Sequence, residues 1–177
     1  MKTKLIITSL LLISMHFFAQ NKIAVGSLLQ TVTLKDGNDI DKKIPFIGEK
    51  LVTVFYTDPD VKDVNDPLSN AIKERKYSAT KYQGIGVGNC ADTWIPNAAI
   101  RMKSREKEAQ FKGSIILLDT DHILKKAWGF KETNETAIVV IIGIDKKVKF
   151  VSYVKTPEES KAIINEVLKV MDEELKK

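Results

Sequence analysis

The sequence predicts a single α/β domain, a three-layer sandwich in which helices cover both faces of a central mixed sheet. Short apolar, β-branched runs alternate with helix-forming stretches, which is typical of parallel strands joined by helical crossovers. The last two apolar runs, residues 136–144 and 148–154, are separated only by Asp145-Lys146-Lys147, so they are expected to form an antiparallel hairpin. A well-capped helix then closes the chain.

The N-terminus has the features of a secretory signal peptide. Lys2 and Lys4 precede an uncharged apolar run over about residues 5–18, which is too short to span a bilayer. We expect cleavage after Ala19, so that residues 20–177 form one domain in the periplasm or secreted. No later run is long and apolar enough to cross a membrane, so no membrane insertion is expected after cleavage.

Charge and composition narrow the function further. The formal net charge is +5, and basic residues alternate with acidic ones, which argues against a nucleic-acid partner. Cys90 is the only cysteine, so the chain has no internal disulfide and no CxxC pair. His122 is the only histidine after the signal peptide. A zinc site of cysteine and histidine would therefore lack ligands, and no cofactor is expected.

The expected strands are apolar and β-branched and are bounded by turn residues. Residues 51–57, LVTVFYT, form the run most typical of a central strand. The full set comprises two short extended pieces around the Asp36-Gly37-Asn38 turn within residues 26–43, then residues 51–57, 82–90, 114–119, 136–144 and 148–154.

Proline and short polar residues mark the starts of the first two helices. Asp66 is expected to be the N-cap, and Pro67 the first residue, of a helix that runs to about Arg75. A second helix is expected to follow Pro96 and to end before Gly113. Its inward side chains would be Ala98, Ala99 and Met102.

Two more helices are expected in the second half. A short helical turn begins at His122, with Asp121 as its cap, and is closed by Gly129. Thr156-Pro157-Glu158-Glu159 is a capping box, in which threonine and glutamate satisfy free backbone donors reciprocally. Behind it, apolar residues recur at helical spacing: Ile163, Ile164, Val167, Leu168, Met171 and Leu175.

This order of elements resembles the redoxin branch of the thioredoxin-like fold over about residues 26–177. Redoxins carry a hairpin before the first core strand, where TVTLKDGNDI lies, and an extra strand and helix before the final hairpin, where SIILLDTDHILKKAWGF lies. The chain is most similar to the YtfJ-like family of small periplasmic proteins. That resemblance rests on the signal peptide, a first loop without CxxC, the Asn-x-x-Asp-x-x-x-Pro segment NCADTWIP, the AW pair and the DKK-to-TPEE ending. It implies a thioredoxin-like fold and a bacterial periplasmic location, and it brings no settled activity.

The chain departs from redox-active relatives at two places. TDPD, residues 57–60, stands where they carry CxxC, and Glu135 or Thr136 stands where they carry a cis-proline. Dithiol exchange needs an attacking thiolate and a resolving thiol. We therefore expect a non-redox binding or accessory protein, whose partner is an extracytoplasmic protein or a small ligand, and no dithiol oxidoreductase activity.

Two candidate sites have an alternative interpretation. Asp58, Asp60, Asp63 and Asp66 could bind calcium through hard carboxylate oxygens, or they could be ordinary residues of a solvated loop. Cys90 could be the nucleophile of a peroxidatic or mixed-disulfide enzyme, which is the alternative function, or a small, partly buried residue at a strand exit.

Other candidates follow the second core strand. Asp92, Trp94 and Pro96 lie close together in the sequence, and Trp94 could cover a pocket or a partner surface, or pack over the domain edge. His122 could perform acid–base chemistry with neighbouring aspartates, or simply begin its helical turn. The expected binding residues are Asp58, Asp60, Asp63, Asp92 and Trp94.

Overall fold

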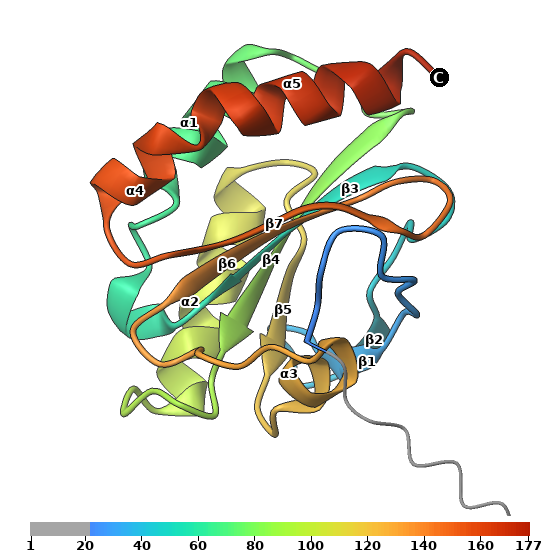
Figure 1. The fold of residues 1–177 in the computed structure, drawn as a ribbon. Coiled ribbons are helices and arrows are strands. Elements are labelled where there is room, and N and C mark those ends of the chain that lie inside the picture. The colour runs from blue at the N-terminus through green and yellow to red at the C-terminus, as the bar shows by residue number, and fades with distance from the viewer. Residues whose placement is uncertain (1–21) are drawn as a thin grey trace, which may run out of the picture.

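The computed structural model describes residues 22–177, so the predicted signal peptide and its cleavage site lie outside the described residues. Seven strands form one mixed sheet in the order β2-β1-β5-β4-β3-β6-β7 (Figure 1). No helix within this part of the chain is long and apolar enough to cross a membrane. The strands are β1 (Thr33–Lys35), β2 (Asp41–Lys43), β3 (Leu51–Thr57), β4 (Tyr82–Asn89), β5 (Ile116–Asp119), β6 (Ala137–Ile142) and β7 (Val148–Val154).

The register of the sheet brings several loops to one edge. Strands β3, β4 and β5 run parallel, with Thr57 opposite Gly88 and Asn89 opposite Asp119. Strand β6 runs antiparallel to β3, and its first residue, Ala137, lies opposite Thr57. The loops that follow β3, β4 and β5 therefore meet the residues that lead into β6. We call this end of the sheet the carboxyl edge.

Helices complete the three predicted layers (Figure 1). Successive residues of a strand point to opposite faces, so Val54 of β3 packs with Leu124 of α3, whereas Leu51 packs with Leu68 of α1 and Met171 of α5. The helices are α1 (Asp66–Glu74), α2 (Asn97–Gln110), α3 (Ile123–Trp128), α4 (Pro157–Ala162) and α5 (Ile164–Leu175), with a 3-10 turn at Pro59–Val61.

Helix α2 has the predicted extent but a different inward face. Its buried residues are Ile100 and Ser104, whereas Met102, expected inward, is 45% exposed. Ile100 packs with Cys90 and Leu118. The Ser104 hydroxyl donates to the Ile100 carbonyl at 2.9 Å. This hydrogen bond satisfies the polar side chain, so Ser104 can be buried on the inward face of α2. The prediction of Ala98, Ala99 and Met102 as the inward residues was wrong.

Two helix boundaries also differ from the predictions. Helix α1 begins at Asp66, one residue earlier than expected, and its N-cap is Asn65, whose side-chain amide donates to Thr57 Oγ1 at 3.0 Å. The C-terminal helix is divided at Ile163 into α4 and α5. Ile163 packs both with the small cluster around Val64 and with the larger core beneath α5, so the division lies where the chain passes from one cluster to the other.

The capping box is largely confirmed. Thr156 is the N-cap of α4, and its hydroxyl accepts a hydrogen bond from Glu159 N at 3.2 Å. The Glu159 carboxylate reaches back to the backbone N–H of Lys155 at 2.7 Å. A typical capping box returns to the N-cap residue itself, so the reciprocal bond here is made one residue earlier.

Candidate functional site

Buried polar residues concentrate at the carboxyl edge. Among residues 22–177, nine polar or charged residues are buried, and six of them lie here. Buried polar groups are costly unless they are hydrogen-bonded, so their concentration singles out this edge as the candidate site. The six residues are Asp58, Asn65, Asn89, Asp119, Thr133 and Thr136.

Asp58 joins the loop after β3 to the residues before β6. The side chain is fully buried, and its two oxygens accept hydrogen bonds from Asp60 N at 3.0 Å and Glu135 N at 2.8 Å. Asp58 N–H in turn donates to the Thr136 carbonyl. Glu135 adopts a left-handed backbone with φ 47°, which is uncommon for a residue with a side chain. Asp58 thus links the loop after β3 to the residues that lead into β6.

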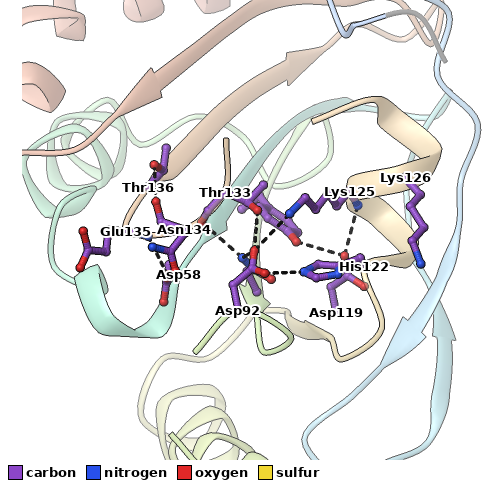
Figure 2. A network of polar contacts seen from close by, with 12 residues as sticks. Asp58, Asp92, Asp119, His122, Lys125, Lys126, Thr133, Asn134, Glu135 and Thr136 are labelled. Atoms are coloured by element: carbon purple, nitrogen blue, oxygen red, sulfur yellow. Dashed lines mark hydrogen bonds and ion pairs between the residues drawn. The ribbon is translucent and has the colours of Figure 1, made fainter. Parts of the chain in front are cut away.

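Asp92 is the centre of a second network at the same edge (Figure 2). Its Oδ2 accepts from Thr133 Oγ1 at 2.5 Å, from Asn89 Nδ2 at 2.7 Å and from Lys125 Nζ at 3.3 Å. Its Oδ1 lies 2.7 Å from His122 Nε2. One carboxylate therefore connects the end of β4, helix α3 and the segment before β6.

The charge state of Asp92 follows from these donors. Burial by itself favours the neutral acid, but the hydrogen bonds from Thr133, Asn89 and His122 outweigh it and hold the pKa of Asp92 well below its usual range. An ionised carboxylate can only accept hydrogen bonds. His122 Nε2 must therefore carry the proton that it shares with Asp92, and Nδ1 is the ring nitrogen left for a ligand.

Asp119 caps helix α3 from a distance. Its carboxylate accepts backbone hydrogen bonds from Ile123, Leu124 and Lys125 at 2.6, 3.0 and 3.2 Å. The predicted cap, Asp121, is exposed and does not hold the helix start. The reason is that His122, the N-cap, has φ 58°, and this turn directs the free N–H groups of α3 toward Asp119.

Asp119 also accepts a hydrogen bond from the hydroxyl of Tyr56 at 3.2 Å. Tyr56 is fully buried on β3, and burial together with the Asp119 charge raises the pKa of its phenol well above the ordinary value. Tyr56 therefore stays protonated and acts as a donor.

Cys90 lies apart from the Asp92 network although only one residue separates it from Asp92. Its side chain is 6% exposed and packs with Ile100 and Leu118, and the thiol donates weakly to the Gly88 carbonyl at 3.5 Å. Burial and the nearby Asp119 carboxylate raise the pKa of Cys90 to about 12. A reactive cysteine needs the opposite environment, one that favours the thiolate.

The other predicted site residues lie near the edge without forming one pocket. Thr93 Oγ1 donates to Asp60 Oδ1 at 3.0 Å, which joins the loop after β4 to the loop after β3. Asp63 and Asp66 are exposed. Trp94 is 84% exposed, so it does not pack over the domain edge.

The calcium hypothesis gains no support from this geometry. Both oxygens of Asp58 are already occupied by backbone N–H donors. Within residues 22–177, no three His, Cys, Asp or Glu side chains come together as a metal site would require. The four aspartates therefore do not converge on one cation position.

Sequence reasoning identified Asp92 but not the donors that surround it. The NCADTWIP segment contains a usable signal, because Asn89 donates to Asp92 three residues later. Lys125 and Thr133 were not singled out, since they lie 33 and 41 residues from Asp92. Only the spacing of His122 and Lys125, which places both on one side of a helix, offered a local indication.

The fold and this edge together define a thioredoxin-like protein with a single cysteine. The loop that follows its strand β3 begins with the buried residue Asp58. Residues 50–174 match the family described as "Bacterial protein of unknown function (YtfJ_HI0045)", and the chain belongs to that family. This confirms the resemblance seen in the sequence motifs. No curated protein matches the sequence.

Solved structures confirm the fold class. A candidate thiol:disulfide interchange protein DsbE from Chlorobium tepidum is 14% identical, with TM-score 0.59 over 84% of this chain and 99% of that chain. A peroxiredoxin-like protein from Aquifex aeolicus is 12% identical, with TM-score 0.57 over 85% and 89%. The exposed lipoprotein thioredoxin Etrx1 from Streptococcus pneumoniae is 14% identical, with TM-score 0.51 over 70% and 88%. At these identities the likeness concerns the fold.

Proposed function

We propose that the protein is an exported thioredoxin-fold protein that lacks dithiol chemistry and acts as a binding or accessory protein through its carboxyl edge. The observation that carries this proposal is the role of Asp58. Asp58 lies where a redox loop would be expected, and its buried carboxylate holds two loop segments together through Asp60 N and Glu135 N. This role is structural, and a carboxylate cannot carry out thiol–disulfide exchange.

Cys90 supports the same proposal. A one-cysteine enzyme would need an accessible thiolate, whereas Cys90 is buried among apolar side chains and its pKa is raised to about 12. It also follows β4, while the redox loop of the fold follows the first core strand, β3. The alternative function, a peroxidatic or mixed-disulfide enzyme, is therefore less well supported.

Export is the second part of the proposal. It rests on the N-terminal apolar run behind Lys2 and Lys4 and on the resemblance of the sequence motifs to the YtfJ-like periplasmic proteins. Expression of the full chain in bacteria should yield a protein in the periplasmic fraction that begins at Gln20. Recovery of the uncleaved chain from the cytoplasm would contradict export.

The redox part is tested with purified residues 20–177. We expect no acceleration of insulin-disulfide reduction by dithiothreitol, because one buried thiol cannot complete a dithiol cycle. A Cys90→Ser variant should give the same rate as the unmodified domain. Reduction faster than the reductant alone, lost on that substitution, would overturn the proposal in favour of the one-cysteine enzyme.

A further inference from the structure

A pocket of about 220 Å³ lies beside the Asp92 network. Four of its lining residues belong to one side of α3 and its caps, since His122, Lys125, Lys126 and Gly129 are spaced at i, i+3, i+4 and i+7. Phe130 and Lys131 complete the lining. Its volume is below that of typical sites for drug-sized ligands, so the pocket suits a compact group.

The charged groups around the pocket are mainly cationic. Lys125, Lys126 and Lys131 contribute three positive charges, and the carboxylate of Asp92 lies 3.3 Å from Lys125 Nζ and 2.7 Å from His122 Nε2. Lys126 Nζ donates to the Asp121 carbonyl at 3.3 Å, which restrains its position. Lys125 reaches toward Asp92, whereas Lys126 lies apart from Asp92 (Figure 2).

Side chains, and not the helix terminus, must recognise the ligand. The first free N–H groups of α3 already donate to Asp119, so they are not available to an anion. Asp92 occupies Nε2 of His122, so this nitrogen is not available to a ligand either. Gly129, at φ 69°, adds no side chain to the wall, and Phe130, 5% exposed, is apolar.

Ammonium groups around a small space favour one class of ligand. Lysine binds phosphate as a compact point charge, and three lysines around a space of about 220 Å³ suit a small ligand that carries more than one negative charge. We infer that the pocket along α3 binds a phosphate group, either free phosphate or a small phosphate monoester, between Lys125, Lys126 and Lys131.

This inference rests on the proposed binding function, because it names the ligand class of a site at the same edge. The test uses the purified domain of residues 20–177, titrated with inorganic phosphate at constant ionic strength and followed by isothermal calorimetry and by amide NMR shifts. We expect saturable binding, with the largest shifts at His122, Gly129 and Lys131. A glycerol phosphate arm distinguishes a monoester from free phosphate by tighter binding.

Exposed lysines provide matched variants that should not disturb folding. Lys126→Gln and Lys131→Gln should each weaken phosphate binding by about tenfold, because each removes one charge-assisted contact. Lys112→Gln removes the same charge next to the start of β5, at the far end of the sheet, and should change affinity by less than about twofold because salt screens distant charges.

The outcomes separate this inference from the proposed function. Absence of saturable binding at millimolar phosphate and glycerol phosphate, or equal losses in all three lysine variants, would overturn the phosphate site. Either result would leave the non-redox proposal standing, since insulin reduction decides that independently. Catalysed insulin reduction would overturn the proposed function even if phosphate bound.

Discussion

The Asn-x-x-Asp part of NCADTWIP corresponds to a hydrogen bond between the side chains of Asn89 and Asp92. Asn89, at the end of β4, directs its amide at the carboxylate three residues later, while His122, Lys125 and Thr133 approach from two other segments. The side chain is only 17% exposed. The Asp92 carboxylate is partly buried and accepts hydrogen bonds from several donors, so it holds the loop after β4 in one conformation. A fixed conformation is what a preformed binding surface requires.

Replacing Asp92 by asparagine tests this role. Asp92→Asn removes the charge and half of the accepting capacity, so we expect the free energy of unfolding to fall by about 1–3 kcal/mol. Urea denaturation at pH 7 measures it. Asp63→Asn, a change at an exposed aspartate, is the matched control and should lie within about 0.5 kcal/mol of wild type. Equal losses in the two variants would contradict the role assigned to Asp92.

The lowered pKa of Asp92 also predicts how stability depends on pH. The folded-state pKa lies below the unfolded value of about 3.9. The stabilisation is therefore full above about pH 4 and is lost as pH falls through the folded-state pKa. Urea midpoints measured from pH 6 to pH 2 should fall more steeply for wild type than for Asp92→Asn. Parallel curves would show that Asp92 is not a source of the pH dependence.

Cys90 should be protected from modification in the folded protein. With a pKa near 12 and not the ordinary 9.0, its thiolate fraction at pH 8 is about a thousandfold smaller. Labelling with a maleimide should therefore be at least about a hundredfold slower in buffer than in urea. Equal rates under the two conditions, in a sample shown by circular dichroism to be folded, would remove the main argument against a thiol enzyme.

At the scale of elements, the start of helix α3 allows the observed cap, Asp119, to be compared with the cap expected from the sequence, Asp121. Asp119 accepts three backbone hydrogen bonds there, whereas Asp121, the residue that the sequence favoured, is exposed. Asp119→Ala should cost more than about 2 kcal/mol, because buried donors, including the Tyr56 hydroxyl, lose their acceptor. Asp121→Ala should cost less than about 0.5 kcal/mol. Thermal or urea unfolding of the pair decides between the two caps.

Elements specified by local signals were predicted well. The final hairpin, the strand at residues 51–57 and the Thr156 capping box follow from alternation, turn residues and capping chemistry that lie within a few positions of one another. The cap of α3 was missed because it depends on the left-handed conformation of His122. That conformation sets the direction of the helix and is not evident from a histidine in the sequence.

The candidate site could be predicted only in part. Asp92 and its neighbour Asn89 belong to one short segment, so the motif pointed to them. The donors Lys125 and Thr133 are distant in sequence, and they reach Asp92 only because β4, β5 and β6 end or begin at the same edge. Trp94 could not be placed from the sequence either, because an aromatic residue is usually expected to pack against the domain, whereas this side chain is 84% exposed.

At the scale of the whole molecule, the backbone amides of central strands should be better protected from deuterium exchange than those of edge strands. All six residues of β6 are fully buried, and β6 is paired on both sides, with β3 and β7. Amides of β3 and β6 should therefore be the slowest to exchange with deuterium, because they open only on global unfolding. Amides of β2, an exposed edge strand of three residues, should exchange fastest among the strands. Slower exchange in β2 than in β6 would contradict this order of stability.

The outer edge of the sheet is partly closed by the chain itself. Gly26 N–H donates to the Val148 carbonyl, and Val148 N–H donates to the Ser27 carbonyl. Leu29 N–H donates to the Lys146 carbonyl. The first described residues therefore cover the beginning of β7. Uncovered edge strands invite pairing with other chains. A recombinant protein begun after Leu29 would leave these backbone groups free, and we expect it to associate into oligomers by strand addition where the chain begun at Gln20 stays monomeric.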